Sequence, residues 1–359
     1  MTGPNPILVE VVRNGWVESV HRGSVYVSGP DGQPALQAGK PDESCFPRSA
    51  NKPMQAVAML RSGLDLADEA DLALATASHS GEPVHVERVR ALLASAGLSE
   101  DDLGCPPQLP IGEEAAHAVL GAGGGPARVL MNCSGKHAAM LLTCQAAGWP
   151  REGYLEPDHP LQREVRRVVE QLAGEPVTAT GVDGCGAPLF AITLIGVARS
   201  FRALVTAEPG TPERRVADAM RAHPLLVAGS TRDDTRLMGA VPGLLMKGGA
   251  EGVHAAALAD GSAVALKIDD GHTRARMPVM VAVLRALGVD APEFDRWATS
   301  PVLGGDGVVG AVRLRDVAPL SRGPLNRPAT SGGSAPGGGC QGGSAPLSRG
   351  SGGREPPGK

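Results

Sequence analysis

The chain has 359 residues, of which 42% are apolar and 20% charged, a composition typical of a globular protein. The formal net charge is −4, but residues 321–359 carry +4, so the remainder carries −8. A mildly acidic body with only 3% aromatic residues disfavours nucleic acid and anionic membrane as partners. It suits a small neutral or zwitterionic substrate.

The sequence also bears on location. No apolar run approaches the ~20 residues that a membrane-spanning helix needs. Residues 1–13 show no basic segment followed by an apolar one, so we predict no signal peptide. Six cysteines in a chain of this length do not form a disulfide framework. We therefore expect reduced thiols and a cytoplasmic protein.

The first predicted elements are short β-branched strands at 7–12, 16–20 and 24–27, with a fourth near Leu36. Turns at Asn14-Gly15 and Arg22-Gly23 would join the first three into an antiparallel meander.

Helical patterns dominate the middle of the chain, and strand patterns return late. The predicted helices are 49–62, 83–96, 137–147 (after a strand at 128–131), 160–173, 212–222 and 277–287. The late strands are expected at 254–258, 263–268 and 307–314. This order predicts an α+β fold, a mostly antiparallel sheet flanked by helices, in which early strands pair with late ones.

The end of the chain differs in composition. Residues 321–359 include 12 Gly, 6 Pro and 6 Ser, too little apolar surface to offset chain entropy. We predict one folded domain over residues 1–320 and a disordered tail over 321–359, with Cys340 an exposed thiol in that tail.

The first candidate for chemistry is the S-x-x-K pair Ser49 and Lys52. On a helix, residues three apart share a face, so the amine can approach the hydroxyl. A serine needs a base, and a lysine serves if burial and nearby positive charge, here Arg48, depress its pKa. Alternatively, the spacing arises by chance and Lys52 is an exposed helix charge.

A second candidate is the small, polar run Ser78-His79-Ser80-Gly81-Glu82, which precedes a helix. One interpretation is a loop that presents Ser78 and His79 to a cleft, and another is that Ser80 caps the helix; both can hold, because Ser78 and Ser80 need not share a role. A third is the turn that contains Lys247, which is followed by Gly248 and Gly249. Its small residues suggest close approach of a ligand, and the alternative is a surface turn.

Two further loops hold cysteines. Cys133 precedes Lys136 in Asn-Cys-Ser-Gly-Lys-His, and Cys185 follows Asp183 in Asp-Gly-Cys-Gly. Two thiols in polar loops could bind a soft metal such as Zn²⁺, although their spacing is not a C-x-x-C pair. Free buried thiols are the alternative.

Together, these motifs resemble, in the same order, the asparaginase II family of thermolabile, rhizobial-type L-asparaginases. The resemblance covers residues 6–315 and leaves out the Gly-rich tail. It implies a fold similar to serine β-lactamases and penicillin-binding proteins, hydrolysis of L-asparagine to L-aspartate and ammonia, and a homodimer.

The resemblance also implies roles for residues. Ser49 would be the nucleophile with Lys52 as its base, and Ser78 with Lys247 a second pair. Zn²⁺ would be bound by Cys133, Lys136, Cys185 and water, and would organise the pocket rather than activate water. The substrate-binding residues would be Arg48, His79, Glu82 and Asp183, the last facing the substrate ammonium or supporting the metal site.

Two other functions remain open from the sequence. One is a β-lactamase or peptidase with the same acyl-serine chemistry, disfavoured by the absence of a signal peptide. The other is a non-catalytic protein that binds zinc or an amino acid.

Overall fold

The computed structural model describes residues 3–315, all within one compact unit. Its main feature is an eight-stranded antiparallel sheet in the order β10-β11-β1-β2-β9-β8-β7, with β3 paired to β2. The strands are β1 (Ile7–Arg13), β2 (Trp16–Ser28), β3 (Pro34–Ala38), β7 (Leu245–Gly248), β8 (Val253–Ala257), β9 (Ala263–Ile268), β10 (Thr299–Gly304) and β11 (Gly307–Leu314). A smaller sheet contains β4 (Ser44–Cys45), β6 (Pro188–Thr193) and β5 (Ala179–Val182).

Most of the helices lie between β4 and β7 in the chain. They are α1 (Lys52–Arg61), α2 (Glu69–Ala75), α3 (Pro83–Ser95), α4 (Glu113–Gly121), α5 (Ser134–Ala146), α6 (Pro160–Ala173), α7 (Leu194–Thr206), α8 (Pro212–Ala222), α9 (Pro224–Val227) and α10 (Asp233–Ala240), followed after the sheet by α11 (Arg276–Ala286) and α12 (Glu293–Ala298). Short 3₁₀ helices are η1 (Arg48–Asn51), η2 (Glu100–Asp102) and η3 (Thr273–Ala275). No helix within residues 3–315 has the length and apolar character needed to cross a bilayer.

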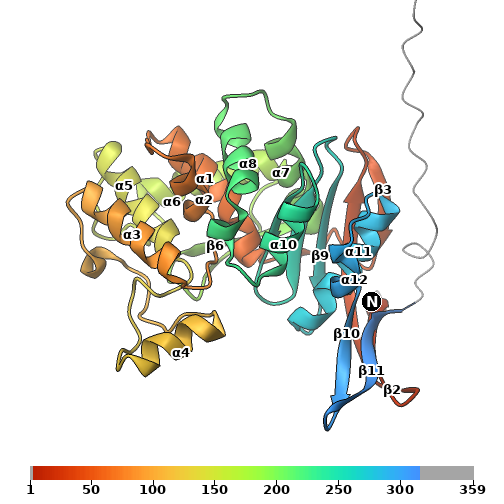
Figure 1. The fold of residues 1–359 in the computed structure, drawn as a ribbon. Coiled ribbons are helices and arrows are strands. Elements are labelled where there is room, and N and C mark those ends of the chain that lie inside the picture. Colours follow the sequence, from red (N-terminus) through yellow and green to blue (C-terminus); the bar gives the residue numbers. More distant parts are fainter. Residues whose placement is uncertain (1–2, 316–359) are drawn as a thin grey trace, which may run out of the picture. The chain divides into compact units, whose positions relative to one another are not determined.

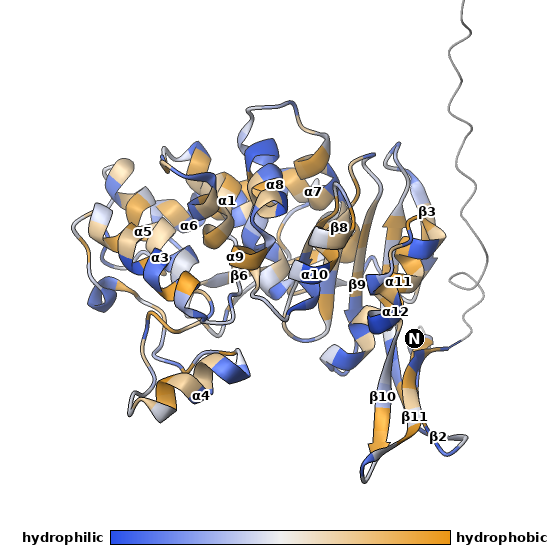
Figure 2. Ribbon diagram, viewed as in Figure 1, coloured by the Kyte–Doolittle hydropathy of each residue, from blue (hydrophilic) through white to orange (hydrophobic). Residues whose placement is uncertain are grey.

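The sheet is covered on both faces at its centre. The helix α7 packs against β2, β8 and β9, whereas α11 packs against β1, β8, β9 and β11. Figure 1 shows these two helices on opposite sides of the sheet. Every residue of β8 is buried, as expected for a strand with helices on both sides. In Figure 2, α6 and α8 combine hydrophobic and hydrophilic residues, as amphipathic helices do.

The predicted pairing of early and late strands is confirmed. The strand β1 pairs with β11, and β2 pairs with β9, in both cases antiparallel. The six predicted helices also exist, with ends shifted by at most three residues. The first of them begins as the 3₁₀ helix η1 before it continues as α1.

Two local predictions are wrong. No turn occurs at Arg22-Gly23, because β2 continues through it from Trp16 to Ser28. Gly23 serves a close strand contact instead, since a Cβ there would lie 2.3 Å from the Lys267 carbonyl oxygen. The expected strand at 128–131 is a series of turns, beside a single bridge between Gln108 and Ala127. A short apolar run can be buried in a strand or in a series of turns, so its periodicity cannot distinguish the two.

The predicted tail, 321–359, and Cys340 lie outside the described residues.

Candidate active site

Ser49 lies in η1, immediately before α1. Pro53 stands in the first turn of α1, where its missing N–H costs no helical hydrogen bond. The Ser49 side chain is half-buried, and its hydroxyl makes no hydrogen bond to any other described residue. Arg48 before it has a left-handed backbone (φ +51°), which a residue with a side chain rarely adopts. The segment thus leaves an accessible, unengaged hydroxyl at the start of a helix.

Lys52 is buried, with 1% of its surface exposed, so it is not the surface charge that one interpretation of the sequence allowed. Its Nζ donates to Ser78 Oγ (2.8 Å), to Cys133 Sγ (3.0 Å) and to the Ala77 carbonyl. These three acceptors match the three donors of an ammonium group. Within the described residues, no hydrogen bond joins Lys52 to Ser49, although the two share one turn.

Lys247 approaches the same hydroxyl from the sheet. It lies on β7, fully buried, and not in a surface turn. Its Nζ donates to Ser78 Oγ at 3.1 Å. Burial, opposed by Asp234 and aided by Lys52, lowers the pKa of Lys247 from 10.5 to about 7. The Ser78 hydroxyl is therefore held between two buried amines, one of which exchanges its proton near neutral pH.

Asp234, on α10, was not found from the sequence. Its buried carboxylate accepts from the Gly248 backbone N–H (3.0 Å) and from His254 Nε2 (2.8 Å), and lies 3.9 Å from Lys247 Nζ. Burial opposes ionisation, but the interactions with His254 and Lys247 hold the pKa of Asp234 below its usual value. Asp234 thus fixes β7 at Lys247. The one sequence signal was His254, a polar residue inside an apolar strand, which needs a buried partner.

Ser80 does not cap α3, as one interpretation proposed. The N-cap of that helix is Glu82, and Ser80 Oγ instead donates to the Ala228 carbonyl. The Glu82 carboxylate accepts from the Ser230 backbone N–H at 2.8 Å. It therefore binds the loop after α9 to the start of α3.

The His79 side chain is fully buried. Its Nε2 lies 2.9 Å from Ser134 Oγ, and its ring stacks on His85 with centroids 5.0 Å apart. Burial, together with His85, holds the pKa of His79 well below its usual value, so the ring is neutral. Among the four residues predicted to bind substrate, only Arg48 and Asp183 contact each other.

Arg48 and Asp183 form a half-buried ion pair, with Arg48 Nε 2.8 Å from Asp183 Oδ1. A second carboxylate, that of Glu251 in the turn between β7 and β8, lies 3.6 Å from Arg48 Nη1. Because Arg48 adjoins Ser49, the structure places this charged group next to the unengaged hydroxyl.

The two predicted cysteine loops also meet. Cys133 caps the start of α5, Lys136 lies in its first turn, and Cys185 lies between β5 and β6; all three are buried. Lys136 Nζ lies 3.1 Å from Cys185 Sγ. A hydrogen bond with Cys133 and the charge of Lys136 lower the pKa of Cys185 despite its burial. The arrangement thus favours a thiolate at Cys185.

This cluster contains only two ligands of the usual metal-binding kinds. Across residues 3–315, no group of three or more His, Cys, Asp or Glu side chains could hold a metal ion. The donor set of two sulfurs and one amine still fits Zn²⁺ chemically, provided that Lys136 loses its proton. In the structure, burial opposes the ammonium form, but the charge of Cys185 raises the pKa of Lys136.

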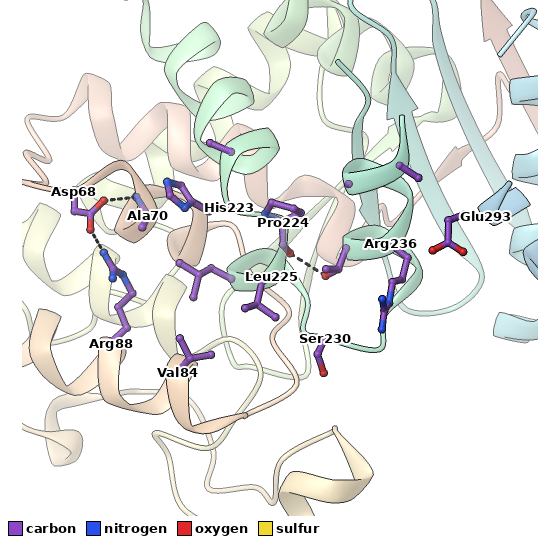
Figure 3. A pocket seen from close by; sticks show the side chains of 15 residues that line it. Asp68, Ala70, Val84, Arg88, His223, Pro224, Leu225, Ser230, Arg236 and Glu293 are labelled. Atoms are coloured by element: carbon purple, nitrogen blue, oxygen red, sulfur yellow. Dashed lines mark hydrogen bonds and ion pairs between the residues drawn. The ribbon is translucent and has the colours of Figure 1, made fainter. Parts of the chain in front are cut away.

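A pocket of about 810 Å³ lies elsewhere, between α2, α3, α9 and α10 (Figure 3). Its lining includes Arg88, which is paired with Asp68, and Arg236. Its lining includes neither Ser49 nor Ser78 and no lysine or cysteine, so we assign it no part in their chemistry.

The model of one protein family, described as L-asparaginase II, matches residues 9–314. None of the curated proteins matches the sequence.

Proposed function

The chain belongs to the L-asparaginase II family, which makes it an asparaginase-type amidohydrolase, and we propose that it hydrolyses L-asparagine through an ester with Ser49. The observation that carries this mechanism is the Ser78 hydroxyl held between Lys52 and Lys247, with Lys52 one helical turn after Ser49, whose own hydroxyl is unengaged. Buried amines at a serine hydroxyl are the arrangement that base-activated nucleophilic catalysis requires.

In the first step, Ser49 Oγ attacks the side-chain amide carbon of asparagine, and Lys52 takes the hydroxyl proton. For this, Lys52 must first be neutral, so its own proton must move. Ser78 and Lys247 provide the route, because Lys247 has a pKa of about 7 and exchanges protons readily near neutral pH.

In the second step, the C–N bond breaks and the leaving nitrogen takes a proton through Ser78, so that ammonia departs. The oxyanion of the tetrahedral intermediate needs N–H donors, and we expect the Ser49 backbone N–H to be one. Water then hydrolyses the aspartyl ester, the C–O bond breaks, and the proton returns to Ser49.

For substrate binding, we propose that Arg48 receives the α-carboxylate and that Asp183, its partner, faces the α-ammonium. His79 and Glu82 were expected to bind substrate, and we propose that they do so indirectly, since their contacts fix the loop that presents Ser78.

We propose Zn²⁺ as a cofactor bound by Cys133, Lys136 and Cys185. When bound, the ion would supply a fixed positive charge that organises the substrate pocket. Lys52 contacts Cys133, which links this cluster to the Ser–Lys centre. Whether Zn²⁺ is bound would therefore affect how Lys52 is oriented.

Three broader expectations follow from the family. We propose that the antiparallel sheet with its flanking helices is a serine β-lactamase-like fold. We also propose a homodimer, which sedimentation velocity would test, and a cytoplasmic location.

The proposed function is tested by ammonia release from L-asparagine, with L-glutamine and a β-lactam as rival substrates. We expect release from asparagine, a loss of at least about a thousandfold in Ser49→Ala, and a large loss in Ser78→Ala. Full activity in Ser49→Ala would contradict the mechanism. Stronger release from glutamine would contradict the substrate, and covalent modification of Ser49 by penicillin with no asparaginase activity would favour a β-lactamase or peptidase.

A further inference from the structure

Two residues with left-handed backbones face each other beside Ser49. Of the non-glycine residues within 3–315, only Asn14, Arg48 and Glu251 have positive φ, and the last two contact each other. Such a conformation is unfavourable in a residue with a side chain, and this kind of strain clusters at functional sites. Asn14 needs no such explanation, because Asn tolerates the tight turn between β1 and β2.

The turn that carries Glu251 would favour another residue. The Val253 backbone N–H donates to the Ala250 carbonyl at 3.3 Å, and the two central residues, Glu251 (φ +55°) and Gly252 (φ +72°), both have positive φ. This is the pattern of a type I′ hairpin turn, in which Asn-Gly is the preferred pair. Turn formation therefore does not explain a glutamate here, and its side chain must have another use.

The Glu251 side chain has a defined place. Its Oε2 lies against Gly271, where an added Cβ would come within 2.7 Å of it. Its Oε1 lies 3.6 Å from Arg48 Nη1, and 66% of the side chain is exposed. The Glu251 carboxylate thus lies on the solvent side of Arg48, whereas the Asp183 side chain, only 14% exposed, contacts Arg48 from the protein side.

One cation is therefore flanked by two carboxylates, next to the proposed nucleophile. This charge pattern complements a zwitterion: the guanidinium suits a carboxylate, and the two carboxylates suit an ammonium group. We propose that Glu251, together with Asp183, binds the α-ammonium group of the substrate and so selects amino-acid amides over amides that lack the α-amine. This inference rests on the proposed function, because it takes Arg48 as the carboxylate site.

Direct binding tests the proposal without turnover. Calorimetric titration would compare L-aspartate with succinate, which has the same two carboxylates but no ammonium group. We expect Glu251→Gln to weaken L-aspartate binding by about three- to tenfold and to leave succinate binding unchanged or stronger. Glu43→Gln is the matched control: Glu43 is 64% exposed and paired with Lys40, and its loss should affect neither ligand.

A second variant separates binding from turn strain. Glu251→Asn should raise the melting temperature, because Asn suits the turn, and should weaken L-aspartate binding as Glu251→Gln does. Equal weakening of aspartate and succinate, no change in either, or no aspartate binding by the wild-type protein would overturn the proposal. Aspartate binding that depends on Glu251, without ammonia release from asparagine, would overturn the proposed function alone.

Discussion

At the scale of single residues, the site depends on where one proton resides. Ser78 Oγ accepts from Lys52 and from Lys247, and Lys52 is also bound to a carbonyl and a thiol. Lys52 thus donates to three acceptors at once. Lys247 is the neighbour whose pKa, about 7, allows it to be neutral under ordinary conditions. In the proposed mechanism, the two lysines therefore have different tasks.

The first prediction concerns pH. If catalysis needs neutral Lys247, kcat/KM should rise with pH through a midpoint of about 7. The charge of Asp234 raises the pKa of Lys247, so Asp234→Asn should move this midpoint to lower pH, while Asn keeps a similar shape. Asp233→Asn is the control, because Asp233 pairs with Arg276 instead. A midpoint that stays in place or moves upward in Asp234→Asn would contradict the role of Lys247.

The second prediction concerns the metal. Wild-type protein should contain about one zinc per chain by elemental analysis. Cys185→Ser should lose most of it, because a thiolate binds Zn²⁺ more strongly than a serine hydroxyl does. Cys144→Ser serves as the control, since Cys144 is a buried thiol within α5, outside the cluster. Zinc content that is absent from the wild type, or equal in both variants, would rule out this site.

Sequence motifs led to the chemistry-bearing residues Ser49, Lys52, Ser78 and Lys247, and the structure brings Ser78 together with both lysines. They did not lead to Asp234, because a carboxylate on an otherwise ordinary helix carries no local signal. Its importance comes from burial against β7, and burial is a property of the fold.

At the scale of elements, the position of Ser49 depends on a close contact with the β7–β8 turn. A Cβ on Gly249 would lie 2.6 Å from the Pro47 carbonyl oxygen and 3.2 Å from the Val253 Cβ. The hairpin that carries Lys247 is thereby packed directly on the segment that carries Ser49. This contact sets the relative positions of the two Ser–Lys pairs.

The third prediction follows from that contact. Gly249→Ala should destabilise the protein by about 1–3 kcal/mol and reduce kcat, because η1 and the hairpin must move apart. Denaturant unfolding and steady-state kinetics would measure both effects. The control Gly239→Ala, a helical site with open space around it, should be neutral or stabilising by up to about 1 kcal/mol. Normal stability and kcat in Gly249→Ala would show that the contact is unimportant.

Helices and strands were predictable from the sequence where the local start and stop signals agreed with the apolar pattern. The helix α6 begins with Pro160 and ends at Gly174 in a left-handed conformation, both as expected from the sequence. The wrongly predicted turn at Gly23 shows the opposite case, in which a glycine serves a long-range approach to Lys267. A single sequence cannot distinguish these two uses of glycine.

At the scale of the whole molecule, the sheet joins the two ends of the described chain. The strand β1 lies between β2 and β11, with Val12 opposite Ala311 and Arg13 opposite Gly310. The sequence predicts that late strands pair with early ones. It does not predict their order or register, because several antiparallel arrangements satisfy the same apolar pattern. These contacts join residues about three hundred positions apart, so the sheet is complete only when nearly the whole domain is in place.

The fourth prediction tests this closure. A Cβ on Gly310 would lie 1.8 Å from the Val12 carbonyl oxygen, so Gly310→Ala should disrupt the β1–β11 pairing and lower stability by about 1–3 kcal/mol or more. Gly307→Ala, on the same strand with its nearest atom at 3.9 Å, should have little effect. Equal melting temperatures for the two variants would contradict this account of the sheet.

The most direct test of the central claim is to trap the covalent intermediate. Wild-type protein mixed with L-asparagine would be quenched in acid within the first turnovers, digested and analysed by mass spectrometry. The account predicts that the peptide containing Ser49 gains the mass of one aspartyl group, and that Ser49→Ala gains none. An aspartyl ester on Ser78 instead, or undiminished ammonia release by Ser49→Ala with no ester on either serine, would contradict it.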